Sequence, residues 1–240
     1  MESTALRRPS PISEVSIGNP EIVFYGDRIL QYRGSAKRVK IGPQFSYVDQ
    51  GAFKTAKNLE ELDTGDGVKE LAPFALDATL TVKKLIIGPG LKTVHGGALA
   101  RLPSLEKIEV DPGNRSFKIV DGVLFSSDMS LLLCYPAKRK GDSYEVPAKA
   151  ESIDIGAFCD CVNLVKVRFP SSLKEIDNAA FANCPSLSDV FLPSSIGYVG
   201  KNAFRGCPSL LTLRVAASSL PLNWDPNFAG GSTVQYGAKG

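Results

Sequence analysis

The chain has 240 residues, with 28 Lys or Arg against 25 Asp or Glu, which gives a formal net charge of +3. So small a basic excess argues against a nucleic acid or an acidic membrane as a partner, and we expect neither. The longest apolar run, Leu131–Tyr135, is too short to cross a bilayer. The length allows a sizeable core, and we expect one continuous domain over residues 21–240.

Residues 1–20 contain Arg7 and Arg8 but no apolar stretch of signal-peptide length. We therefore expect a flexible arm there, and a cytoplasmic protein if Met1 is the native start. A secreted or surface-displayed protein stays open as the alternative. Residues 21–38 hold two short apolar runs around Gly26-Asp27, which predicts a β-hairpin that caps the N-terminal end of the domain.

A repeat of 23 residues begins near residue 39 and dominates the chain. Its marker is an Ala followed by a large apolar residue, at Ala52-Phe53, Ala75-Leu76, Ala98-Leu99, Ala157-Phe158, Ala180-Phe181 and Ala203-Phe204. A fixed period of this size indicates a stacked solenoid. Apolar residues nine and eleven positions after the marker point the same way from a strand. We expect one parallel sheet of about eight short strands over residues 39–111 and 141–215, with short 3-10 or helical turns opposite.

The two sets of repeats are separated by 36 residues more than one period. The excess contains Asp121-Gly122 between apolar runs, which predicts a tight turn. We expect residues 112–140 to form an inserted β-meander that leaves the strands around Ile108 and Tyr144 adjacent in the sheet. Lys138, Arg139 and Lys140 end the insertion. A solvated loop is the plainer interpretation of this basic run, and a phosphate contact is the alternative.

Residues 216–240 are expected to form a C-terminal cap. We interpret Trp224 as a residue that seals the last turn, with a ligand platform as the alternative. The repeat frame also places Leu222 in the core, at the position that Val199 occupies one repeat earlier.

Two units, Leu164–Cys184 (LVKVRFPSSLKEIDNAAFANC) and Leu187–Cys207 (LSDVFLPSSIGYVGKNAFRGC), resemble the BspA-type leucine-rich repeat. The first three units are looser, since Leu76 and Leu99 replace Phe and none of the three has the Cys. The resemblance implies an α/β leucine-rich-repeat solenoid, dominated by β-structure and wound as a right-handed superhelix. It also implies a non-enzymatic recognition scaffold, often on a cell surface, without indicating a ligand.

Three of the five cysteines share one repeat position, namely Cys161, Cys184 and Cys207. We expect a ladder of buried, reduced thiols, because a zinc site would need clustered pairs with His or Cys partners. We predict no metal site and no cofactor. Catalysis would have to use the single histidine, His95, which lies beside Gly96-Gly97 in a turn, so we predict no catalytic residue.

A binding site is expected on the outward face of the parallel sheet, eight and ten positions after each marker. Phe191 lies between two core positions and is predicted to anchor a protein or peptide ligand, flanked by Arg168 and Arg214. The candidate partner-binding residues are Lys84, Ile86, Lys107, Lys166, Arg168, Phe191 and Arg214. An ordinary solvated face is the alternative at these positions. We expect a monomeric scaffold for protein–protein interaction, and a cell-surface adhesin that binds host or matrix proteins is the alternative function.

Overall fold

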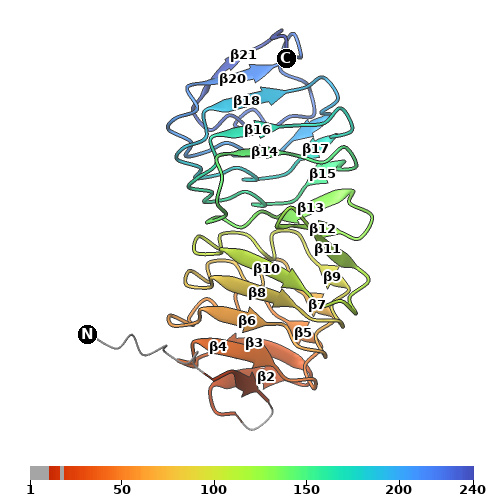
Figure 1. Ribbon diagram of the computed structural model, residues 1–240. Helices are drawn as coiled ribbons and strands as arrows, with labels where there is room; N and C mark the ends of the chain where they lie inside the picture. Colours follow the sequence, from red (N-terminus) through yellow and green to blue (C-terminus); the bar gives the residue numbers. More distant parts are fainter. Residues whose placement is uncertain (1–10, 17–18) are drawn as a thin grey trace, which may run out of the picture.

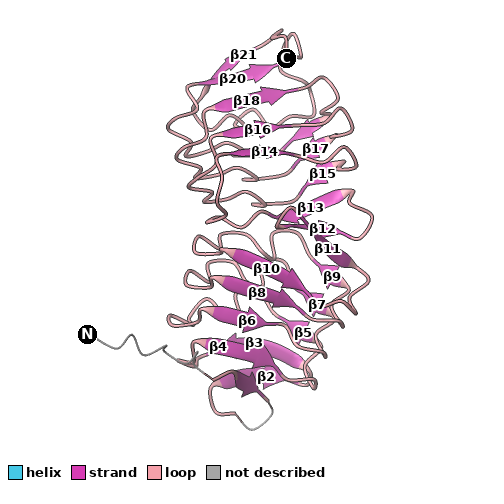
Figure 2. Cartoon of the chain, viewed as in Figure 1, coloured by secondary structure: helices cyan, strands magenta, loops and turns pink. Residues whose placement is uncertain are grey.

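The computed structural model describes residues 11–16 and 19–240 and shows an elongated β-solenoid (Figure 1). Short strands joined by turns make up the described chain, which contains no helix (Figure 2). The solenoid prediction is confirmed, but the turns that we expected as 3-10 or helical are not helical. The reason is local: Ala179 and Asn183, on either side of Phe181, have φ of 53° and 58°, and such left-handed residues interrupt a helical run.

Each turn of the solenoid contributes a strand to a main sheet and, in most turns, a shorter strand to a side sheet. The N-terminal main sheet is parallel, in the order β1 (Ser13–Val15), β4 (Arg38–Ile41), β6 (Glu61–Asp63), β8 (Lys84–Ile87) and β10 (Lys107–Val110). The N-terminal side sheet runs β2 (Ile22–Tyr25), β3 (Arg28–Tyr32), β5 (Tyr47–Val48), β7 (Glu70–Leu71) and β9 (Thr93–Val94).

The second half repeats this arrangement. Its main sheet is parallel, in the order β14 (Ser143–Glu145), β16 (Lys166–Arg168), β18 (Asp189–Leu192), β20 (Thr212–Val215) and β21 (Thr233–Gln235). Its side sheet runs β11 (Phe117–Val120), β12 (Val123–Ser126), β13 (Leu131–Cys134), β15 (Ser152–Ile153), β17 (Glu175–Ile176) and β19 (Tyr198–Val199).

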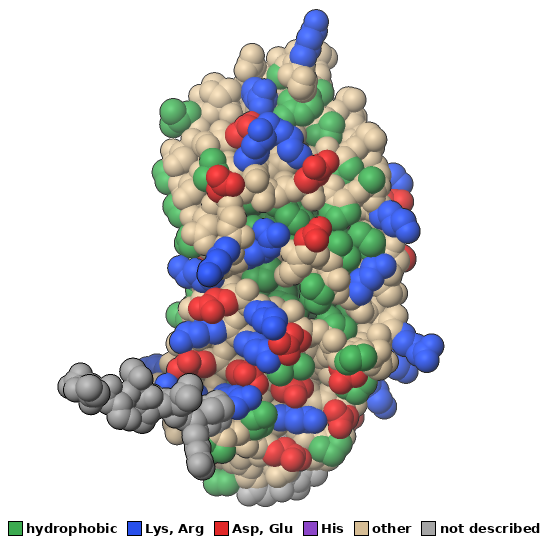
Figure 3. Space-filling view, in the orientation of Figure 1, with side chains coloured by type: hydrophobic (Ala, Val, Ile, Leu, Met, Phe, Trp, Pro, Cys, Tyr) green, Lys and Arg blue, Asp and Glu red, His purple; other side chains and the backbone are tan. Residues whose placement is uncertain are grey.

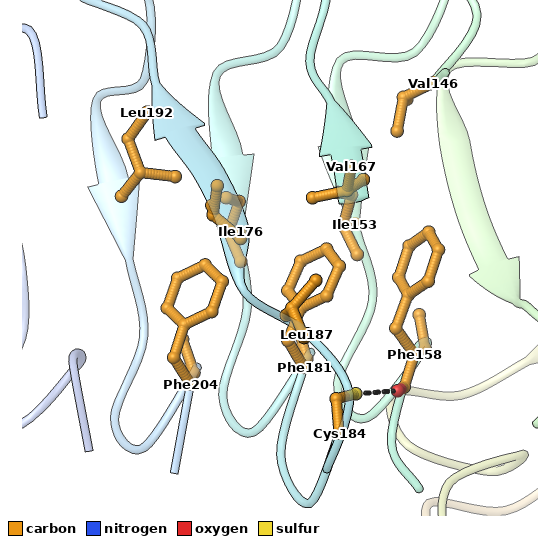
Figure 4. Packing of buried hydrophobic residues seen from close by; sticks show 14 of the residues in the cluster. Val146, Ile153, Phe158, Val167, Ile176, Phe181, Cys184, Leu187, Leu192 and Phe204 are labelled. Atoms are coloured by element: carbon orange, nitrogen blue, oxygen red, sulfur yellow. Dashed lines mark hydrogen bonds between the residues drawn. The ribbon is translucent and has the colours of Figure 1, made fainter. Parts of the chain in front are cut away.

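The register of the strands follows the 23-residue period. Leu62 pairs with Leu85, which pairs with Ile108, so that equivalent repeat positions lie side by side. The marker phenylalanines stack in the same way: the ring centroids of Phe158 and Phe181 are 4.5 Å apart, and those of Phe181 and Phe204 are 5.2 Å apart (Figure 4). Such pairs contribute about 0.5–1.5 kcal/mol beyond the burial of their area.

A ladder of thiols accompanies the phenylalanine stack. All five cysteines are free and buried, which confirms the burial predicted for Cys161, Cys184 and Cys207. The Cys184 thiol donates to the carbonyl oxygen of Phe158 at 3.0 Å (Figure 4). The Cys207 thiol donates to the carbonyl oxygen of Phe181 at 3.1 Å. Burial raises the pKa of Cys161, so the neutral thiol is the stable form.

The insertion does not behave as expected. Strands β11, β12 and β13 form an antiparallel meander, but β10 and β14 end up in different sheets. The prediction that the strands around Ile108 and Tyr144 are neighbours is therefore wrong, and the single parallel sheet is in fact two.

The physical reason is that the meander is apolar on both faces. Leu124 and Leu133 belong to the N-terminal hydrophobic core, whereas Phe125 and Leu132 belong to the C-terminal one. Since successive side chains of a strand point to opposite faces, one layer of strands can serve two cores. The meander is a septum between two halves and not a graft on the surface of one.

Both ends of the solenoid are covered. The predicted N-terminal hairpin is present as β2 and β3, and Tyr32 packs on Phe53 with ring centroids 5.5 Å apart. The expected flexible arm is wrong for Ser13–Val15, which forms β1 and pairs with the otherwise free edge of β4. Residues 1–10 and 17–18 of that arm lie outside the described residues.

At the C-terminal end, Trp224 is buried and its ring lies 5.1 Å from that of Phe228. The carbonyl of Phe228 accepts from the N–H of Phe204, so this segment covers the last repeat. The core position predicted for Leu222 is wrong, because that side chain is fully exposed. The chain leaves the repeat frame after Val215, and the indole fills the space instead.

Candidate binding surface

The outward face of the N-terminal main sheet is covered by ion pairs. Nζ of Lys84 and of Lys107 lie 2.9 Å and 2.8 Å from the carboxylate of Glu109, and hydrogen bonds from Lys107 and then Lys84 lower its pKa. Ile86 is half-buried in register between Asp63 and Glu109. Three predicted site residues therefore lie together here, but each is already engaged with its neighbours.

The outward face of the C-terminal main sheet is organised around Asp189. Its carboxylate lies 2.8 Å from Nη2 of Arg168, 2.8 Å from Nη2 of Arg214 and 3.5 Å from Nζ of Lys166. The Arg168 guanidinium is the main cause that lowers the pKa of this carboxyl to about 2. Three cations held by one anion leave an excess of positive charge at fixed positions.

Phe191 lies beside this cluster. The burial of β18 alternates along the strand, with Val190 and Leu192 in the core and Phe191 half-buried on the outward face. Cζ of Arg214 lies 5.9 Å from the centroid of the ring, within the range of a cation–π contact. Gly240 lies against the same ring, since a Cβ at that glycine would be 2.8 Å from Cε1 of Phe191. The ring is thus partly shielded by its own chain.

The seven predicted residues do not share one surface. Lys84, Ile86 and Lys107 lie on β8 and β10, whereas Lys166, Arg168, Phe191 and Arg214 lie on β16, β18 and β20, beyond the break between the main sheets. The predicted set did not include Asp189, the residue that joins the second group. A signal was present in the sequence, because Asp189 is acidic at a repeat position where Lys84, Lys107 and Lys166 are basic.

The break itself holds a basic cavity of about 720 Å³, lined by Lys83, Lys107, Lys138, Arg139 and Lys140 together with Ser104 and Glu106. The Nε of Arg139 donates to the carbonyl of Asp121 at 3.1 Å, and its Nη1 donates to the hydroxyl of Tyr135 at 3.2 Å. These bonds fix the loop of residues 138–140 to the meander. Lys138 and Lys140, on either side of Arg139 in the sequence, are exposed.

A second cavity, of about 400 Å³, lies at the seam, the boundary between the N-terminal and C-terminal halves. It opens on the side of the turns that carry the Ala-Phe and Ala-Leu markers. Its lining joins the two halves, with Phe74 and Arg101 from the first and Ile155 and Arg205 from the second. Arg101 is paired with Asp77, with Nε 2.6 Å from Oδ1. The lining thiol, Cys159, has its pKa raised to about 12 by burial, which makes it a poor nucleophile.

Outside these surfaces and cavities, the structure offers few groups suited to catalysis or metal binding. His95 is half-exposed with Nε2 3.4 Å from Glu70, as expected of a turn histidine on a surface. Across residues 11–16 and 19–240, no group of His, Cys, Asp or Glu is placed to hold a metal ion. The same residues include no helix long and apolar enough to cross a membrane.

The sequence pattern of the BspA type leucine-rich repeat region matches residues 24–131 and 134–220 in six copies. This chain belongs to that family. A search of curated proteins finds no match.

Solved structures of bacterial leucine-rich repeat proteins share the fold. The pneumococcal vaccine antigen PcpA superposes with a TM-score of 0.61 at 23% identity, over 89% of this chain and 66% of that one. A leucine-rich repeat protein from Eubacterium ventriosum gives 0.59 at 18%, over 82% and 65%. A leucine-rich cell surface protein from Faecalibacterium prausnitzii gives 0.55 at 15%, over 92% and 96%. The chain spans just under two thirds of the first two structures.

Proposed function

We propose that this leucine-rich-repeat chain is a non-enzymatic, monomeric scaffold that binds a protein on the outward face of its C-terminal main sheet. The observation that carries the proposal is the cluster on the C-terminal main sheet, where Asp189 holds Arg168 and Arg214 beside the half-buried ring of Phe191. Arginine and aromatic side chains with restricted motion are typical of the residues that dominate binding energies.

The charges of this cluster indicate the chemistry of the ligand. Lys166, Arg168 and Arg214 outnumber Asp189, so the patch favours an acidic segment of a partner. A guanidinium binds a carboxylate with two parallel hydrogen bonds and stacks on aromatic rings. An acidic or aromatic peptide therefore suits this patch better than an aliphatic one does.

A second candidate function is that of a cell-surface adhesin that binds host or matrix proteins. It is favoured by the similarity to a cell surface protein of F. prausnitzii and to a pneumococcal vaccine antigen. The adhesin function requires a displayed chain, whereas the scaffold function does not. Antibody labelling of intact cells tests the adhesin function, since only a displayed chain is labelled without permeabilisation, and absence of labelling would refute it.

The test of the proposed function is a capture experiment with matched variants. The wild-type chain, Phe191→Ala and Lys84→Ala are immobilised, and the proteins that each retains from a lysate and from culture medium are compared. The proposal requires a protein that wild type and Lys84→Ala retain but Phe191→Ala loses. It is refuted if every protein retained by the wild type is retained equally by Phe191→Ala and by an Arg168→Ala/Arg214→Ala variant.

A further inference from the structure

The break between the main sheets leaves β10 with a free edge. The N–H of Lys107 donates to Lys83 and that of Asp111 donates to Ile87, both on the side of β8. Backbone groups alternate along a strand, so the N–H and C=O of Ile108 and Val110 point away from β8. Within the described residues, β10 pairs with no strand other than β8, and no further backbone hydrogen bond engages these two residues.

The basic cavity begins at this same edge. Lys107 is the first residue of β10, and the N–H of Lys138 donates to the carbonyl of Leu105 at 2.8 Å, which brings the basic loop beside the start of the strand. Arg139 fixes the loop through Asp121 and Tyr135. The backbone of the basic loop is therefore fixed next to the start of β10, and the unpaired backbone groups of Ile108 and Val110 follow along the same strand.

The charges at the cavity leave a positive excess. Lys107 is paired with Glu109 and Lys83 with Glu60, while Glu106 contributes one further carboxylate. Lys138 and Lys140 are exposed, and in the part of the chain that the structure describes neither forms an ion pair.

Strand β14, which begins the C-terminal main sheet, differs from β10 in the charge of its surroundings. The free edge of β14 is flanked by the exposed Asp142 and Glu145, which disfavour an acidic ligand there. Between the two main sheets, hydrophobic side chains gather at the waist of the molecule with Lys and Arg side chains beside them (Figure 3). Val110, at the end of β10, is only half-buried.

We infer that the edge of β10 is a docking site for an extended acidic segment of a partner protein. The segment adds to the N-terminal main sheet as a further strand, its backbone pairing with Ile108 and Val110 and its carboxylates lying among Lys107, Lys138 and Lys140. Main-chain hydrogen bonds supply the affinity and the cations select the acidic sequence. This inference rests on the proposed function in taking a protein as the ligand, but it assigns a different site.

The probe is a fluorescein-labelled peptide of about eight residues that alternates Glu and Thr, a length typical of a strand. Its binding to the full chain is followed by fluorescence anisotropy at low salt. We expect saturable binding that weakens at least about tenfold in Lys138→Glu/Lys140→Glu, whereas Lys69→Glu/Lys92→Glu, at exposed lysines elsewhere, leaves it unchanged. Methylation of alternate backbone nitrogens of the peptide is expected to abolish binding, since it removes strand pairing without changing the charge.

Val110→Pro tests the edge from the side of the chain. The N–H of Val110 points away from β8, so proline removes the donor that would bind the segment and leaves the hydrogen bonds between β8 and β10 intact. Val110→Ala controls for the lost side chain. We expect Val110→Pro to lose binding at an unchanged melting temperature. The inference is overturned if the N-methylated peptide binds as well as the parent, or if a sulfated oligosaccharide binds through Lys138 and Lys140 while the peptide does not. Loss of peptide binding in Arg168→Ala/Arg214→Ala alone would also overturn it, while supporting the proposed function.

Discussion

The carboxylate of Asp154 accepts a hydrogen bond from the N–H of Gly97 at 3.3 Å, across the seam between the two halves of the solenoid. The acid is buried, and burial raises its pKa from 3.8 to about 6. The folded chain therefore retains a proton between about pH 4 and pH 6 that the unfolded chain has lost. The contribution of Asp154 to the free energy of unfolding therefore falls as the pH rises through this window.

Asp154→Asn is expected to remove that dependence. The amide keeps an oxygen to accept from Gly97 and cannot ionise, so the variant should gain about 2–3 kcal/mol at pH 7 and nothing at pH 4. Urea unfolding at both pH values provides the measurement. A variant that is less stable than the wild type at pH 7 would show that the ionised carboxylate stabilises the seam.

Two phenylalanines in the same repeat region test the assignment of core and surface. Phe181 is fully buried between two other rings, whereas Phe191 is half-buried on the outward face. Phe181→Ala should cost about 3–5 kcal/mol, and Phe191→Ala less than about 1 kcal/mol. Thermal unfolding of the two variants is the measurement, and equal losses would place Phe191 in the core.

The septum predicts that neighbouring residues stabilise different halves. Leu124 contacts the N-terminal core and Phe125 the C-terminal core. Leu124→Ala should therefore increase hydrogen exchange first in β7 and β8, and Phe125→Ala in β15 and β17. The same pattern of exchange in both variants would mean that the two halves share one core.

The burial of the thiol ladder predicts that its cysteines react slowly with thiol reagents. All five cysteines are free and buried, and burial raises the pKa of Cys134 to about 12. A thiol reagent at pH 8 should label no cysteine of the native chain and all five after denaturation. Rapid labelling of the native chain would contradict the burial of the ladder.

Much of this fold could be predicted from the spacing of residues. The period places Phe158, Phe181 and Phe204 in one stack because every turn must bury the same position against its neighbour. The break between the main sheets could not be predicted from the period, which gives the length of the insertion and its place in the sequence but not whether it packs on the surface or between the two halves. A local signal was present: Val123, Leu124 and Phe125 are consecutive apolar residues, as in strands buried on both faces.

The candidate surface was less predictable. Strand alternation places Arg168, Phe191 and Arg214 on the outward face, but it does not specify how charges pair between strands. Asp189 reaches both arginines because side chains of neighbouring strands lean diagonally, and such contacts depend on sheet twist and rotamers.

The most direct test of the proposed function is the affinity of a captured partner for Arg168→Ala/Arg214→Ala compared with the wild type. Both arginines are at least about one third exposed, so their loss should hardly change the melting temperature. Titration calorimetry should show affinity reduced at least about tenfold, with Lys84→Ala as an unaffected control. An unchanged affinity in the double variant would contradict a ligand site on the C-terminal main sheet.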